Sequence, residues 1–171
     1  MIFLKKVNLE EIEEEYNFLS KMPSANGFEN EYENLPRENF EQHIQALLDH
    51  SEGKNLKEGY VPDTYFFLWD DNKIVGVFKL RHYLNDWLRK NAGHLGFGIL
   101  PEENGKGYAS KGLALMKEEA AKIIKENELY LAVHKDNPAS LKVQQKKWCL
   151  HSWRNRKRIL NKNKNKIKSY W

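Results

Sequence analysis

Cysteine and long apolar runs are scarce in this chain of 171 residues. The single cysteine, Cys149, has no partner for an internal disulfide, which is typical of proteins that work in a reducing cytoplasm. No apolar run approaches the ~18–20 residues that a membrane span requires, and the apolar patch within residues 1–6 is too short for a secretory signal. We therefore expect a cytoplasmic protein that has no membrane partner.

Acidic residues are missing from the last part of the chain. Residues 1–145 carry 18 Lys and Arg and 24 Asp and Glu, a net charge of −6, whereas residues 146–171 carry 10 basic residues and no acid. Apolar residues make up 40% of the chain, which is enough to bury the core of one domain. The sequence is thus an acidic body followed by a basic tail.

Hydrophobic periodicity predicts a mixed α/β fold. The expected strands are 2–7, 65–69, 74–78, 93–100 and 128–133, and the expected helices are 9–22, 40–48, 108–125 and one that begins near 136. This order predicts a mainly antiparallel first half and one parallel βαβ crossover, with helices flanking a central sheet.

The segment 93–113 is the most informative part of the chain. A strand ends at Pro101, a loop containing Gly105 and Gly107 follows, and a helix begins at Tyr108. Several main-chain N–H groups can then converge at one helix N-terminus, which is how proteins hold a pyrophosphate. The strand before the loop alternates bulky residues with His94, Gly96 and Gly98, so one of its faces is nearly bare and leaves room for a ligand.

Two common nucleotide-binding motifs do not fit this loop. A Walker-type loop needs a glycine where Leu100 stands and a Ser or Thr where Gly107 stands. The dinucleotide pattern is met only as Gly105-x-Gly107-x-x-Ser110, without a clear acidic partner for a ribose.

The run Asn104-Gly-Lys-Gly-Tyr-Ala109 resembles the acetyl-CoA loop of the Gcn5-related N-acetyltransferases, whose pattern is Arg/Gln-x-x-Gly-x-Gly/Ala. Gly107 and Ala109 match this pattern, and Asn104 replaces the usual Arg or Gln. The run that begins Asp136-Asn-Pro-Ala-Ser140 resembles the family's Asn-x-x-Ser helix opening. The segments 80–85 and 93–97 resemble a bacterial subgroup of predicted acetyltransferases, and the resemblance covers residues 1–146.

The resemblance implies an α/β acetyltransferase fold and transfer of an acetyl group from acetyl-CoA to a primary amine of a small molecule or protein. It implies no metal site. One N–H on the strand before the loop would stabilise the oxyanion that forms during transfer. The implied cofactor-binding residues are Phe97, Gly98, Ile99, Leu100, Asn104, Gly105, Lys106, Gly107, Tyr108, Ala109, Ser110, Asn137 and Ser140.

A primary amine must lose its proton before it attacks, so a base is expected. The candidates are His94 and His82, which lie on or at the ends of expected strands, followed by Glu29 and Glu31 in the loop after the first helix. Many relatives have a tyrosine on the last helix as general acid; Gln144 stands at the matching place here.

We divide the chain into an acetyltransferase-like domain, 1–146, and a basic atypical tail, 147–171. The tail does not continue as the family's Lys-Asn-Gly and closing hairpin. Three interpretations stay open: an out-of-frame translation, a nucleic-acid-binding arm with interleaved tryptophans, and disorder. A missing hairpin would leave a sheet edge open and favour low stability or a homodimer.

Two alternatives to an active enzyme also remain. One is a catalytically weak relative that binds CoA without turnover, suggested by Asn104 and Gln144. The other is a nucleic-acid-binding protein that uses the basic tail, although we consider a nucleic-acid partner the weaker expectation.

Overall fold

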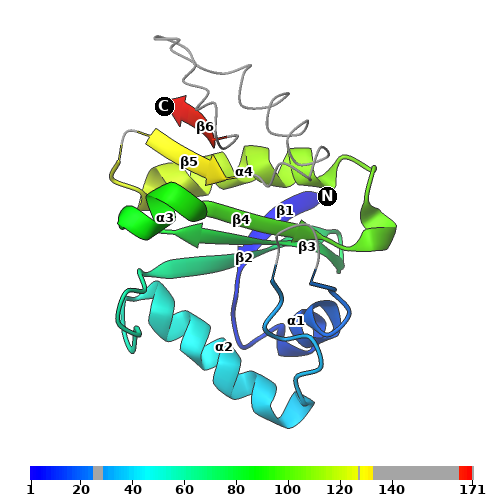
Figure 1. Ribbon diagram of the computed structural model, residues 1–171. Coiled ribbons are helices and arrows are strands. Elements are labelled where there is room, and N and C mark those ends of the chain that lie inside the picture. Colours follow the sequence, from blue (N-terminus) through cyan, green and yellow to red (C-terminus); the bar gives the residue numbers. More distant parts are fainter. Residues whose placement is uncertain (25–28, 127, 133–165, 171) are drawn as a thin grey trace.

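The computed structural model describes residues 1–24, 29–126, 128–132 and 166–170 (Figure 1). In chain order the elements are β1 (Ile2–Lys6), α1 (Ile12–Leu19), α2 (Arg37–Ser51), β2 (Asp63–Asp70), β3 (Lys73–Arg81), α3 (Asp86–Asn91), β4 (Leu95–Ile99), the 3-10 turn η1 (Pro101–Glu103), α4 (Tyr108–Ile123), β5 (Glu128–Ala132) and β6 (Lys166–Tyr170).

The strands form one six-stranded sheet in the order β1-β2-β3-β4-β5-β6. Neighbours from β1 to β4 are antiparallel, and β4 and β5 are parallel because α4 carries the chain across the sheet between them. The expectation of a mainly antiparallel sheet with one parallel crossover is therefore confirmed.

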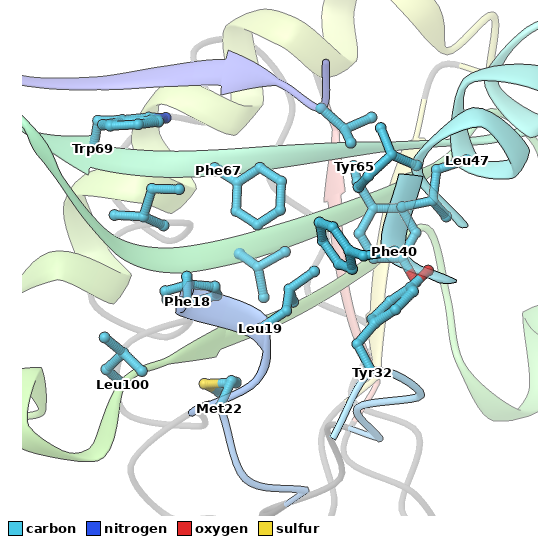
Figure 2. Close-up of a cluster of buried hydrophobic side chains, with 14 residues drawn as sticks. Phe18, Leu19, Met22, Tyr32, Phe40, Leu47, Tyr65, Phe67, Trp69 and Leu100 are labelled. Carbon is cyan, nitrogen blue, oxygen red and sulfur yellow. The ribbon is translucent and has the colours of Figure 1, made fainter. Parts of the chain in front are cut away.

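Helices cover both faces of the sheet (Figure 1). On one face, residues of α1 and α2 such as Phe18, Leu19 and Phe40 pack against Phe67 and Trp69 of β2 (Figure 2). On the other face, Leu113, Met116 and Ala120 of α4 pack against the sheet, where Phe78 is a central residue. Burial of these side chains supplies the main driving force for folding.

The helix boundaries differ from the predicted ones for local reasons. The Asn8 side chain accepts hydrogen bonds from the N–H groups of Glu10 and Glu11, so α1 begins later than residue 9. Pro36 precedes the first turn of α2, which starts at Arg37 rather than 40. Helix α3 was not predicted, because it has too few residues for a periodic pattern. The available signal was Asn85, whose side chain caps the helix by accepting from the Leu88 N–H.

Strand β6 corrects the expectation of an open sheet edge. Residues 166–170 pair antiparallel with β5 along its whole length, so the main chain of β5 has a neighbour on that side. The disorder interpretation is wrong for these residues. The expected helix near 136 and the rest of the tail lie outside the described residues, and the division at residue 146 stays a prediction.

Candidate active site

Strands β4 and β5 meet next to the first residue of β4. Within the described part of the chain, Leu95 and Leu131 are the one parallel pair between them. On its other side β4 stays bonded to β3: the Arg81 N–H donates to the His94 carbonyl at 2.8 Å, and the Leu100 N–H donates to the Val75 carbonyl at 3.1 Å.

This pairing fixes which main-chain groups of β4 are turned toward β5. Successive residues of a strand direct their N–H and C=O groups to opposite sides, so Gly96 and Gly98 bond to β3 like residues 94 and 100. The N–H and C=O groups of Phe97 and Ile99 then face the β5 side. No residue of β5 as far as Ala132 pairs with them.

The loop after β4 leads into the first turn of α4 and contains two glycines in left-handed backbone. Gly105 and Gly107 have φ angles of +82° and +85°, and a Cβ atom added at either would meet no atom within 4 Å. Such left-handed backbone strongly favours glycine. Among the described residues, the N–H groups of Gly105, Lys106 and Gly107 donate no hydrogen bond.

The first turn of α4 adds to this group of donors. A helix leaves the N–H groups of its first residues without internal partners, here Tyr108, Ala109 and Ser110. No described side chain caps this helix, and its first turn contains no acid. The arrangement suits a bound anion such as a pyrophosphate, because the helix dipole also favours negative charge there.

Glu103 brings a negative charge close to this anion site, and two lysines compensate it. The Glu103 carboxylate is largely buried and accepts from Lys106 Nζ at 2.8 Å and Lys73 Nζ at 2.6 Å. These bonds, that from Lys106 first, lower the pKa of Glu103. Glu103 was not predicted as a site residue. Its spacing to Lys106 is typical of an ion pair, but Lys73 lies on β3, 30 residues away in the chain.

Tyr108 reaches the site through its main chain rather than through its phenol. The Tyr108 hydroxyl donates to the Asp70 carboxylate at 2.6 Å, and this bond raises the pKa of Tyr108 to about 12. The contact ties the first residue of α4 to the end of β2.

The other predicted cofactor residues have different surroundings. Leu100 is buried in the core on the α1 and α2 face, so its side chain is structural. Asn104 is exposed in extended backbone just before Gly105. Asn137, Ser140 and Gln144 lie outside the described residues.

The candidate bases do not converge on the loop. His94 and His82 lie at the start of β4 and just after β3, about 16 Å along the strands from the loop that follows Ile99. Burial lowers the pKa of His82, whose Nε2 lies 2.8 Å from the Thr64 hydroxyl. Glu29 and Glu31 are exposed in the connection between α1 and α2.

His94 is fully enclosed, with 0% of its surface exposed. Its Nδ1 accepts from the Tyr130 N–H at 3.0 Å. Burial lowers the pKa of His94, and the nearby Glu126 carboxylate partly opposes this effect. The ring therefore joins β4 to β5 at the point where the two strands meet.

Among the described residues, no helix has both the length and the apolar composition needed to cross a bilayer.

No curated protein matches the sequence. Several solved structures share the fold at low sequence identity. A chimera of Vibrio cholerae spermidine N-acetyltransferase SpeG and hSSAT is 15% identical with a TM-score of 0.59, covering 99% of this chain and 95% of that chain.

Two further solved structures share the fold at similarly low sequence identity. A GNAT-family acetyltransferase from Streptococcus pneumoniae is 17% identical, with a TM-score of 0.54 and coverage of 85% of this chain and 83% of that chain. RimL, a ribosomal L7/L12 α-N-protein acetyltransferase in complex with coenzyme A, is 14% identical, with a TM-score of 0.57 and coverage of 99% and 92%.

These likenesses show the fold. The family follows from the sequence, because the model of the acetyltransferase (GNAT) family matches residues 25–147, more than half of the chain. The match includes β4, the glycine loop and α4, the elements that build the candidate site. The chain therefore belongs to the acetyltransferase (GNAT) family.

Proposed function

We propose that this protein is an N-acetyltransferase that uses acetyl-CoA to acetylate a primary amine. The observation that carries the proposal is the group of main-chain N–H donors from Gly105 to Ser110, which have left-handed glycines, no capping side chain and no acid in the first turn of α4. A pyrophosphate needs this combination of convergent donors and open space.

We assign two parts of acetyl-CoA to described residues. The N–H groups of residues 105–110 would hold the pyrophosphate, and the main-chain groups of Phe97 and Ile99 would hold the pantetheine arm. Bound acetyl-CoA would supply an acetyl group on a thioester that a neutral amine can attack. Since Glu103 is bonded to Lys73 and Lys106, its charge does not oppose a phosphate nearby.

The acceptor is a primary amine of a small molecule or a protein. The structural neighbours support this class, since one is a spermidine N-acetyltransferase and another acetylates the α-amino group of a ribosomal protein. The net negative charge of residues 1–145 favours the approach of a cationic amine.

The acceptor must give up a proton, which costs about 4–5 kcal/mol for a lysine-like amine at pH 7. Of the predicted bases, His82 and Glu29 have exposed surface and can meet an acceptor or a water molecule, whereas the His94 ring is enclosed.

The first test measures acetyl-CoA binding by calorimetry with three matched variants: Gly105→Ala, Gly107→Ala and Gly59→Ala. Gly59 has a φ of +81° and open space around its Cβ position, like Gly105 and Gly107. All three variants should lose a similar stability, about 1–2 kcal/mol, because a side chain is strained in left-handed backbone. Only the two loop variants should bind acetyl-CoA more weakly, by at least tenfold, because their methyl groups enter the anion site.

Equal binding by all three variants would contradict this assignment of the loop. The second test follows release of free CoA thiol across a panel of polyamines, aminoglycosides and peptides with free N-termini. An active enzyme releases thiol with at least one amine. Binding of acetyl-CoA without release across the panel would favour the alternative of a relative that binds CoA but does not turn over.

A further inference from the structure

We infer that Asp63 binds the ammonium group of the acceptor, and that Lys79 occupies this place while no acceptor is bound. Lys79 Nζ lies 3.0 Å from Asp63 Oδ2, and it also lies over the ring of Tyr65, 5.0 Å from the ring centroid. A carboxylate beside an aromatic face is a combination that binds ammonium ions. The inference rests on the proposed function, because it names the residue that would hold the amine of that reaction.

The three side chains share one face of the sheet with unfilled space. Lys79 pairs with Tyr65 on β2 and with Gly96 on β4, and paired residues of antiparallel strands lie on the same face. Asp63 comes two residues before Tyr65, so it lies on that face as well. This is the face that α1 and α2 cover, because Tyr65 belongs to the core on their side (Figure 2). A Cβ atom added at Gly96 would meet no atom within 4 Å, so there is room for a ligand next to Lys79.

This room adjoins the place proposed for the pantetheine arm. Gly96 is followed by Phe97, whose main-chain groups would hold the arm, and successive residues of a strand are about 3.3 Å apart. An amine that enters beside Gly96 would therefore lie near the cofactor as well as near Asp63. Of the Lys79 side chain 23% is exposed, so it can turn outward and give up its place to the acceptor.

The Asp63 carboxylate is only partly satisfied. Its side chain is 6% exposed, and Oδ1 is enclosed without a hydrogen-bond partner among the described residues. An unsatisfied buried acceptor costs stability, so a carboxylate that only joined two strands would be expected to have partners for both oxygens. Such an incomplete polar cluster is more typical of a site that exchanges partners.

Two further charged groups act on this site. Burial raises the pKa of Tyr65, and the negative charges of Asp63 and Glu31 add to this effect, so both acids lie near the ring. Arg81 stands opposite Asp63 on β3, but its guanidinium donates to a main-chain carbonyl of the β3–β4 connection at 3.1 Å. When Lys79 turns outward, the two acids and Arg81 leave one net negative charge, which matches an ammonium ion.

The test compares Asp63→Asn, Lys79→Met and the double variant. If Asp63 binds the acceptor, Asp63→Asn and the double variant should both raise the KM of an accepted amine by at least about tenfold. Lys79→Met removes the competing ammonium and should leave this KM unchanged or lower it. The acetyl-CoA Kd of all three should stay within about threefold of the unaltered protein, because the loop 105–110 is not altered.

An ion pair that only holds β2 to β3 predicts a different pattern. Both single variants would then raise KM alike, since each leaves one charge unpaired, and the double variant would return KM to that of the unaltered protein. Either result would overturn the inference. If a single variant does not fold, the double variant still decides, because it leaves neither charge of the pair without its partner.

Calorimetry separates this inference from the proposed function. The ligand is the amine that the panel identifies, or spermidine if no amine of the panel is turned over. It should bind the unaltered protein at least about tenfold more tightly than the double variant. Equal binding by the two proteins, including binding to neither, would overturn the inference. Failure of the unaltered protein to bind acetyl-CoA would instead defeat the proposed function.

Discussion

Glu15 lies on α1 with only 1% of its surface exposed. One of its oxygens accepts from the Asn8 N–H at 3.2 Å, and the other has no hydrogen-bond partner among the described residues. Burial raises the pKa of Glu15 to about 8, and the neighbouring Glu11 and Glu14 add to this effect. At the residue scale, this carboxyl group makes the stability of the protein depend on pH.

The direction of this pH dependence follows from the pKa of Glu15 in the unfolded chain and in the folded chain. Between the ordinary value of 4.5 and about 8, the unfolded chain has lost the proton while the folded chain keeps it. The contribution of Glu15 to stability is therefore highest below pH 4.5, falls as the pH rises, and levels off above 8. At pH 7 the free energy of unfolding is about 3 kcal/mol lower than below pH 4.5, since each pKa unit corresponds to about 1.4 kcal/mol.

We predict that Glu15→Gln removes this dependence, because glutamine keeps an acceptor for the Asn8 N–H and does not ionise. Urea unfolding should show the variant more stable than the parent by about 4 kcal/mol at pH 8, and within about 1 kcal/mol of it at pH 5. Glu14→Gln, at an exposed position of the same helix, is the control and should change little. A parent whose stability is the same at both pH values would contradict the prediction.

Among the elements, α4 lies very close to the sheet at Gly112. A Cβ atom added at Gly112 would overlap the ring of Phe78, a residue of β3. This close approach couples the packing of α4 to the position of the loop before it. Tyr108 adds a second link through its bond to Asp70.

We predict that Gly112→Ala destabilises the protein although alanine favours helix. Overpacking costs about 1–3 kcal/mol, and the gain in helix propensity, up to ~1 kcal/mol, offsets only part of it. Thermal unfolding should show a Tm lower by a few degrees. Gly96→Ala is the matched control, because its added Cβ atom would meet nothing within 4 Å. A Gly112→Ala variant as stable as the parent would show that Phe78 moves aside at little cost.

For the molecule as a whole, β6 matters because it covers the edge of the sheet. It pairs with all of β5, from Glu128 opposite Tyr170 to Ala132 opposite Lys166. Deleting residues 166–171 would expose a row of unpaired N–H and C=O groups on β5. We predict a lower Tm and concentration-dependent self-association, seen by sedimentation velocity. A truncated chain that stays monomeric and equally stable would indicate that β6 contributes little.

Much of the fold was predictable because its signals are local. The hairpin of β2 and β3, the crossover through α4 and the start of α4 at Tyr108 follow from periodicity, turn residues and glycines close together in the chain. The first strand was found as well, whereas the limits of α1 and α2 depended on Asn8 and Pro36. The strand 166–170 was missed, because its lysine-rich sequence lacks the pattern of a buried strand.

By itself, the sequence determined the loop around Gly105 and Gly107. The proline before the loop, the glycines that favour left-handed backbone and the helix that follows are all signalled by residues close together in the chain. Only the tertiary structure decided the place of His94, whose ring meets the Tyr130 N–H 36 residues away, and of Glu103, which meets Lys73 30 residues away. The physical reason is that a side chain's hydrogen-bond partner depends on which segments of the chain become neighbours in the fold. The residue type alone does not indicate which distant residue that partner will be.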